Sequence, residues 1–181
     1  MMRQEILERK KKLLKNIAIL FLVSIILLVL WIVIFKNGAF DKGFKKEYIS
    51  FKYDSTWKVN KSSDNSVSLT HDTKSIIDIK VTMLTSNHLN SDIENIKEEV
   101  RFDIEKQNVG YNLLKQEKKY FSKEKYEGYK LLYEDGDAQA LVVVLRNDNY
   151  LCVINFTSNN NYFDILLDSF QLILGSIEIK E

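Results

Sequence analysis

The stretch LVVVLRNDNYLCVINF, residues 141–156, holds two apolar segments that are separated by the polar turn NDN. Asn and Asp favour tight turns, so the pattern predicts two antiparallel strands joined by a short hairpin connection. A strand with one face in water alternates apolar and polar residues, whereas these segments are apolar at nearly every position. We therefore expect both strands to lie at the centre of a sheet that is covered on its two faces.

Two further strands are predicted immediately before this pair, over YNLLKQEKKYF (111–121) and KYEGYKLLYE (125–134). The dipeptide Asp135-Gly136 then leads into residues 138–147, and Asp-Gly is a strong signal for a two-residue hairpin turn. The short connections leave no room for a crossover between parallel strands. Residues 111–158 are thus expected to form a four-stranded antiparallel meander.

The remaining segments predict two more strands, two helices and a closing strand. Residues 66–72 and 75–84 alternate polar and apolar side chains, as half-buried strands do. Residues 91–108 instead carry apolar side chains at steps of three and four, which indicates an amphipathic helix, and 160–173 repeat that spacing. A short strand at 175–179 follows. The expected fold class is α+β, with an antiparallel sheet flanked by helices.

The aromatic stretch YISFKYDSTWKV, residues 48–59, is expected to form the first hairpin arm of this sheet, with a turn inside it. Trp57 is the expected core anchor, and the alternation of side chains suggests that Phe51 packs inward with it. This leaves Tyr48 and Tyr53 as candidates for contact with a partner.

The N-terminal region contains 19 consecutive residues without a charge, IAILFLVSIILLVLWIVIF (17–35). As a helix they would extend about 28 Å, close to the thickness of the hydrocarbon core of a bilayer. The run is longer than the apolar core of a secretory signal peptide and is not followed by a small-x-small cleavage site. We therefore predict an uncleaved signal-anchor. The basic cluster that precedes it places the N-terminus in the cytoplasm.

These observations predict the organisation of the chain. Residues 1–16 form a basic cytoplasmic tail, 17–35 a transmembrane helix in contact with membrane lipid, 36–47 a linker, and 48–181 an extracytoplasmic domain. The expected location is the cell membrane, crossed once.

The order of predicted elements over residues 48–179 resembles the PsbP-like fold, an α/β/α sandwich found in many bacterial secreted or anchored proteins. The similarity includes the opening strand, turn and tryptophan of 48–59, the helix 91–108, the meander 111–158 and the closing FDILLDSFQLI with its Ser169-Phe170 pair. The family often has a proline before the tryptophan turn, where this chain has Asp54. The resemblance implies a non-enzymatic domain that docks onto membrane protein complexes or helps to assemble them. A metal role is known for some photosynthetic members, and no residue here matches it.

The residues that could carry chemistry do not form a catalytic or metal-binding pattern. The chain has two histidines, His71 and His88, and no His or Cys pair with ligand spacing. Cys152 lies in an apolar strand, which is typical of an inert buried thiol. Residues 36–181 carry 20 basic and 23 acidic side chains, unlike the basic surface of a nucleic-acid-binding domain. We expect no enzyme activity, no metal, no cofactor and no nucleic-acid partner.

The lysine-rich hairpin KQEKKYFSKEKYEGYK (115–130) allows two interpretations. Lysines on an edge strand protect it from pairing with other chains. Alternatively, the hairpin contacts anionic lipid, a cell-wall polymer or a protein. On the second interpretation, the candidate contact residues, including the two tyrosines of the aromatic stretch, are Tyr48, Tyr53, Lys118, Lys119, Tyr120, Lys123 and Tyr126.

The expected function follows from these features together. The chain is predicted to be a single-pass, non-catalytic protein whose outer domain binds a partner protein complex, or helps to assemble it, at the membrane surface. The alternative is that the domain binds a small molecule or a lipid in a pocket between the sheet and a helix.

Overall fold

The computed structural model describes residues 16–17, 19–29 and 41–180, and the chain divides into two compact units, residues 1–40 and 41–181. In the first unit, residues 16–17 and 19–29 are helical. Within the described residues, no helix combines the length and the apolar character needed to cross a bilayer. The span predicted for residues 17–35 includes 18 and 30–35, which lie outside the described part, so it stays a prediction.

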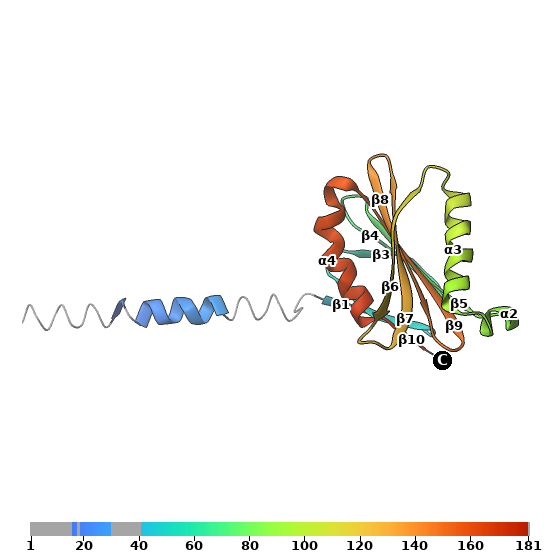
Figure 1. Cartoon of the computed structure of the whole chain (residues 1–181). Helices are drawn as coiled ribbons and strands as arrows, with labels where there is room; N and C mark the ends of the chain where they lie inside the picture. Colours follow the sequence, from blue (N-terminus) through green and yellow to red (C-terminus); the bar gives the residue numbers. More distant parts are fainter. Residues whose placement is uncertain (1–15, 18, 30–40, 181) are drawn as a thin grey trace, which may run out of the picture. The chain divides into compact units, whose positions relative to one another are not determined.

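The second unit has the α+β composition that the sequence predicts (Figure 1). In chain order its elements are β1 (Asp41–Lys45), β2 (Ile49–Asp54), β3 (Lys58–Ser62), β4 (Ser66–Thr70), β5 (Ile76–Met83), α2 (Ser86–Leu89), α3 (Ile93–Gln107), β6 (Asn112–Phe121), β7 (Tyr126–Asp135), β8 (Ala138–Arg146), β9 (Tyr150–Asn159), α4 (Asn160–Ser176) and β10 (Glu178–Ile179).

The main sheet has seven strands in the order β3-β4-β5-β9-β8-β7-β6, and every neighbouring pair is antiparallel. The meander predicted for residues 111–158 is confirmed as β6 to β9. The lysine-rich strand β6 lies at one end of the order, so it is an edge strand.

A second, three-stranded sheet in the order β1-β2-β10 corrects two predictions. The stretch 48–59 was expected to open the main sheet, but its first half is β2 of the small sheet and only its end enters β3 of the main one. The linker predicted at 36–47 is also wrong in its second part. Residues 41–45 form β1, because they pair with β2 from Asp41 opposite Asp54 to Lys45 opposite Ser50.

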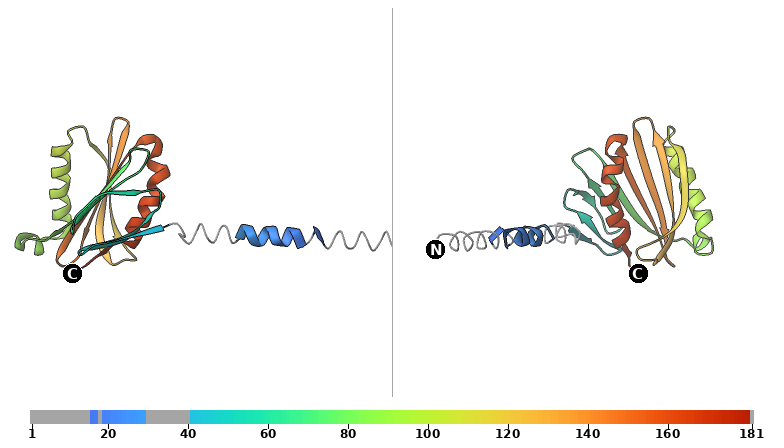
Figure 2. Two further views of the ribbon diagram at one scale, coloured as in Figure 1. Left: turned by 180° about the vertical axis from the view of Figure 1, so that it is seen from behind. Right: turned by 60° about the vertical axis from the view of Figure 1, so that its left-hand side comes forward.

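The two long helices cover opposite faces of the main sheet, as Figures 1 and 2 show. On one face, α4 packs Phe163, Phe170 and their neighbours into a core shared with β2. On the other face, Ile93 and Ile96 of α3 pack on alternate residues of β7 and β8. The expected α/β/α arrangement and the two-sided burial of the central strands are confirmed.

The centre of the larger core is an aromatic cluster around Phe156 of β9. Its ring lies 5.0 Å from that of Phe163 and 5.1 Å from that of Phe170. Trp57, which is fully buried, meets Phe156 edge-on at 6.2 Å and lies 5.3 Å from the ring of His71. The prediction that Trp57 anchors the core is confirmed.

Replacing this anchor should destabilise the domain strongly. Trp57→Ala is expected to lower the free energy of unfolding by about 3–5 kcal/mol, because it leaves a large cavity beside the aromatic cluster. The measurement is urea unfolding of the full chain in a neutral detergent, followed by far-UV circular dichroism. Val59→Ala, on the exposed strand β3, is the matched control and should cost far less. Equal effects of the two substitutions would contradict the anchor role.

Candidate functional site

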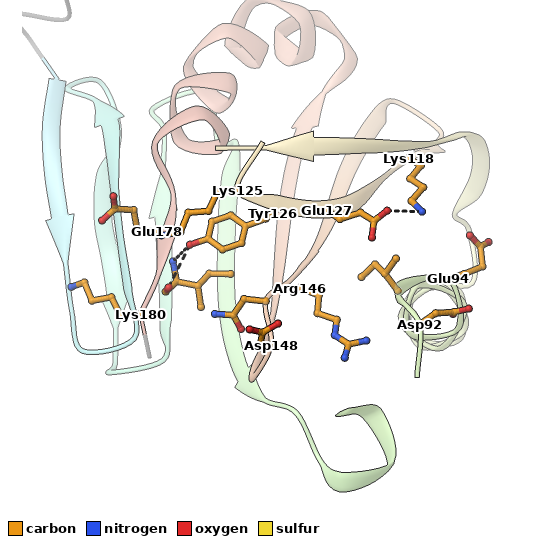
Figure 3. Close-up of a pocket in the computed structure, with 13 residues that line it drawn as sticks. Asp92, Glu94, Lys118, Lys125, Tyr126, Glu127, Arg146, Asp148, Glu178 and Lys180 are labelled. Carbon is orange, nitrogen blue, oxygen red and sulfur yellow. Dashed lines mark hydrogen bonds and ion pairs between the residues drawn. The ribbon is translucent and has the colours of Figure 1, made fainter. Parts of the chain in front are cut away.

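A groove of about 1060 Å³ lies at the end of the main sheet where β7 begins and β8 ends (Figure 3). Antiparallel pairing brings these two strand ends together, and the start of α3 and the short strand β10 flank them. The groove is lined by Asp92, Ile93, Glu94, Lys118, Lys125, Tyr126, Glu127, Arg146, Asn147, Asp148, Glu178, Ile179 and Lys180. Nine of these residues are charged, so the groove is a polar surface.

Arg146, the last residue of β8, holds the wall formed by α2 and α3. Its guanidinium donates one hydrogen bond to the carbonyl oxygen of Leu89 at 2.8 Å and another to the carbonyl oxygen of Ser91. Asp92, which follows Ser91 in the chain, caps α3 by accepting a hydrogen bond from the backbone N–H of Asn95 at 2.8 Å. The start of α3 is therefore tied to the end of the central strand.

A buried lysine joins the first turn of α3 to the sheet. The ammonium of Lys97, whose side chain is 1% exposed, lies 2.5 Å from a carboxylate oxygen of Glu94 and 2.5 Å from one of Glu98. It also lies 4.9 Å from the ring centre of Tyr129, whose hydroxyl donates to Glu94. Burial alone would lower the pKa of Lys97, but the two glutamates outweigh it and raise that pKa above its ordinary value.

The carboxyl of Glu94 is held in its charged form by the same network. The hydrogen bond from Lys97, and after it the one from Tyr129, keep the pKa of Glu94 below its ordinary value of 4.5. In turn, the hydrogen bond to the Glu94 carboxylate raises the pKa of the Tyr129 hydroxyl. This part of the groove wall thus carries a fixed negative charge at neutral pH.

The opposite wall is built from the β6–β7 hairpin and β10. Lys118 and Glu127 form an ion pair of 2.6 Å across the hairpin. The hydroxyl of Tyr126 donates to the carbonyl oxygen of Ile179 at 3.4 Å and accepts from its N–H at 3.0 Å, which attaches β10 to β7. The ammonium of Lys180 donates to the carbonyl oxygen of Lys46 at 2.9 Å.

Asp148, in the turn between β8 and β9, differs from the other acids of the groove. Its carboxylate makes no hydrogen bond or ion pair with any residue of the described part of the chain, whereas Asn147 beside it accepts from the backbone of Asn149 and Tyr150. Asp148 is therefore the carboxylate in the groove that can accept hydrogen bonds from an incoming group without breaking an existing contact.

The predicted contact residues do not form one surface in the structure. Lys118 lines the groove, Lys119 points to the other face of the hairpin, and Tyr120 is 63% exposed. Lys123 lies in the turn between β6 and β7. Tyr48 is half-buried, and its ring lies 5.6 Å from that of Tyr150.

Two of the candidate contact residues, Tyr53 and Tyr126, are buried. Tyr53 lies two residues from Phe51 in the same strand, so it shares the inward face and is only 8% exposed. Tyr126 is 2% exposed, and its hydroxyl accepts a hydrogen bond from the backbone N–H of Ile179.

Sequence reasoning missed the residues that come together only through the fold. Arg146, Asp148, Glu178 and Lys180 lie in different strand ends and turns. The one available signal was a cation that ends the apolar run LVVVL, since a charge at such a place often marks the end of a strand at the surface.

The groups considered for chemistry lie elsewhere. His88 contacts Glu99 at 2.8 Å, His71 contacts Thr73 at 2.9 Å, and no metal-binding cluster of His, Cys, Asp or Glu is found among the described residues. Cys152 is fully buried, and this burial raises the pKa of its thiol far above the usual range. The buried position of Cys152 confirms the prediction for that residue.

The contacts of Arg146 predict a local effect. Arg146→Gln should increase amide hydrogen exchange in residues 86–95 about ten-fold, because hydrogen bonds to a charged group contribute about 1.5–3 kcal/mol. Hydrogen-exchange mass spectrometry of the full chain measures this. Arg101→Gln is the control, because it removes a cation of α3 that pairs with Glu98 and Glu105. This substitution should leave the hydrogen exchange of residues 86–95 unchanged. Unchanged exchange in Arg146→Gln would contradict the proposed attachment.

The depressed pKa of Glu94 predicts a dependence of stability on pH. In the unfolded chain the carboxyl regains its ordinary pKa, so just below pH 4.5 the unfolded state binds a proton that the folded state does not. Stability should therefore fall as the pH drops through this window, and Glu94→Gln should reduce that dependence. The measurement is urea unfolding at pH 3.5 to 6, and Asp103→Asn, at an exposed position of the same helix, is the control. An equal change in the pH dependence of stability in the two variants would refute the role of Glu94.

Comparisons with known proteins concern the fold. No protein-family model and no curated protein matches the sequence. Among solved structures, cyanobacterial PsbP (CyanoP) from Synechocystis sp. PCC 6803 is similar with a TM-score of 0.59 and 12% identity, covering 77% of this chain and 92% of that chain. LpqN of Mycobacterium tuberculosis, described as involved in cell envelope biogenesis, has a TM-score of 0.55 and 11% identity over 78% of this chain and 91% of that chain.

A Pseudomonas aeruginosa protein of unknown function, PA94, described as a putative regulator, has a TM-score of 0.51 and 12% identity over 78% of this chain and 98% of that chain. At such identities the similarity shows the fold alone. This similarity of fold agrees with the resemblance that the order of predicted elements suggested. It also agrees with the α/β/α arrangement of residues 41–180. The chain has a PsbP-like fold.

Proposed function

We propose that this chain is a single-pass membrane protein whose outer domain binds a partner protein at the membrane surface, without catalysing a reaction. The observation that carries the proposal is the charged groove at the end of the main sheet. Its walls are held in place by Arg146, by the Lys97 network and by the contact of Tyr126 with Ile179. A preformed polar surface of this kind is suited to recognising another protein by its charges.

The chemistry of the groove favours a protein over a small apolar ligand. Sites for small molecules are mostly apolar with a few polar groups, and they enclose most of the ligand. Here the lining mixes five acids with four bases: Asp92, Glu94, Glu127, Asp148 and Glu178, with Lys118, Lys125, Arg146 and Lys180. The alternative, a small molecule or lipid held between sheet and helix, is therefore the weaker candidate.

Anchoring is supported by the sequence. The uncharged run 17–35 has the length of a membrane span, and the basic cluster before it favours an N-terminus in the cytoplasm. LpqN, which shares the fold, is described as acting in cell envelope biogenesis. A role in assembly at the cell envelope is consistent with both features.

The proposal predicts a specific cross-link from the groove. A photoreactive amino acid in place of Asp148 should capture a discrete protein in membranes of the native cell, because this exposed position lines the groove. The same group at Asp64, in the exposed turn between β3 and β4, is the matched control and should capture none. Mass spectrometry identifies the product.

A second variant tests whether charge drives the contact. Glu178→Lys reverses one charge of the groove and should reduce the cross-link from position 148, since like charges across an interface repel. Cross-linking to lipid alone, or equal products from positions 148 and 64, would overturn the proposal.

A further inference from the structure

Three lysines gather on the face of the β6–β7 hairpin that is turned toward α4. The pairing of the strands places Glu117 opposite Lys130, Lys119 opposite Gly128 and Lys115 opposite Leu132, so all of these residues lie on one face. This face is opposite to the one that carries Lys118. The cluster formed by Lys115, Lys119 and Lys130 is therefore a separate feature of the surface.

Glu117 is the one carboxylate that pairs with this cluster in the described part of the chain. It contacts Lys119 at 3.0 Å and Lys115 at 3.6 Å. These contacts, with the hydrogen bond from Lys119 first, keep the pKa of the Glu117 carboxyl below its ordinary value. The single carboxylate of Glu117 thus pairs with two ammonium groups, those of Lys115 and Lys119. It forms no ion pair with the third lysine, Lys130.

Lys130 is the unusual member of the cluster. Its side chain is half-buried against α4, where the ammonium donates to the side-chain oxygen of Gln171 at 3.4 Å and lies 5.7 Å from the ring centre of Phe121. Among the described residues no carboxylate lies within ion-pair distance of it, and Asp168, one turn before Gln171, forms no ion pair. Burial, and after it the charge of Lys119, lower the pKa of Lys130, although the charge of Glu117 on the neighbouring strand acts in the opposite direction.

Protection of the sheet edge explains only part of this arrangement. Lys115 and Lys119 lie on the edge strand β6, where lysines discourage pairing with another chain. Lys130 lies on β7, which is paired on both sides, so it protects no edge. A half-buried cation without a carboxylate partner is unfavourable by itself, and an external anion would relieve that cost.

We propose that Lys115, Lys119 and Lys130 bind a phosphate group of an anionic lipid headgroup, so that this side of the β6–β7 hairpin lies on the membrane surface. A phosphate presents several acceptor oxygens and can receive hydrogen bonds from all three ammonium groups at once. The inference rests on the proposed anchoring, which keeps the domain close to the bilayer, where basic residues are attracted to anionic lipid. It leaves the groove, at the end of the sheet, open to a partner.

The test is lysine acetylation of the full chain in lipid nanodiscs. One set of discs contains phosphatidylcholine only and the other adds phosphatidylglycerol, and mass spectrometry follows the rate at each lysine. Lys130 should be acetylated about five-fold more slowly in the anionic discs, which matches the usual attraction of a lysine to an anionic surface. Lys61, on the exposed strand β3, is the control and should react equally in both.

Two further arms identify the source of the phosphate and exclude misfolding. Lys115→Gln with Lys119→Gln should abolish the protection of Lys130 while the far-UV circular dichroism and the unfolding midpoint stay unchanged. Equal acetylation of Lys130 in both types of disc overturns the proposal. Equal protection in phosphatidylcholine discs by inorganic phosphate or by soluble poly(glycerol phosphate) also overturns it, since the site would then serve a soluble anion.

The outcome is independent of the partner-binding proposal. If Lys130 shows no protection but position 148 still cross-links to a protein, only the lipid contact is wrong. If Lys130 is protected but position 148 captures no protein, the lipid contact stands and partner binding at the groove fails.

Discussion

Burial of both faces of β8 and β9 is the constraint on which the rest of the domain depends. On one face Leu141, Val143 and Leu145 face α4, and on the other Val142 and Val144 face α3. A sheet with two apolar faces must be covered twice, and each cover must bring its own apolar stripe. The two amphipathic helices meet this need. Their positions then determine which strand ends and turns remain at the surface.

The groove is a consequence of this layering. Because the strands are antiparallel, the end of β8 and the start of β7 meet at one end of the sheet, and the start of α3 lies beside them. Arg146 extends from the last position of β8 to the carbonyl oxygens before α3, so the central strand and the helix share one contact. Contacts of Arg146, Lys97 and Tyr126 hold the walls of the groove, which makes it a candidate recognition surface.

The hairpin β6–β7 has different surroundings on its two faces. Lys118 and Tyr129 face α3 and the groove, whereas Lys115 and Lys119 face α4 beside Lys130. The sequence shows only a mixture of lysines, glutamates and tyrosines in this region. Because side chains alternate along a strand, the mixture separates into two surfaces of different charge balance once the pairing is known. One hairpin can thus take part in two contacts.

The sequence by itself determined the α+β class, the meander, both long helices and the role of Trp57, because these depend on local periodicity and on the size of one apolar side chain. It failed where the partner of a strand is distant. Residues 41–45 join β2, and Tyr53 turns inward with Phe51, because β2 pairs with β1 and β10 and packs on α4. Only the tertiary structure decided that Arg146, Asp148 and Lys180 surround one groove and that Lys130 lacks a carboxylate partner, since such neighbours come from chain segments far apart in sequence.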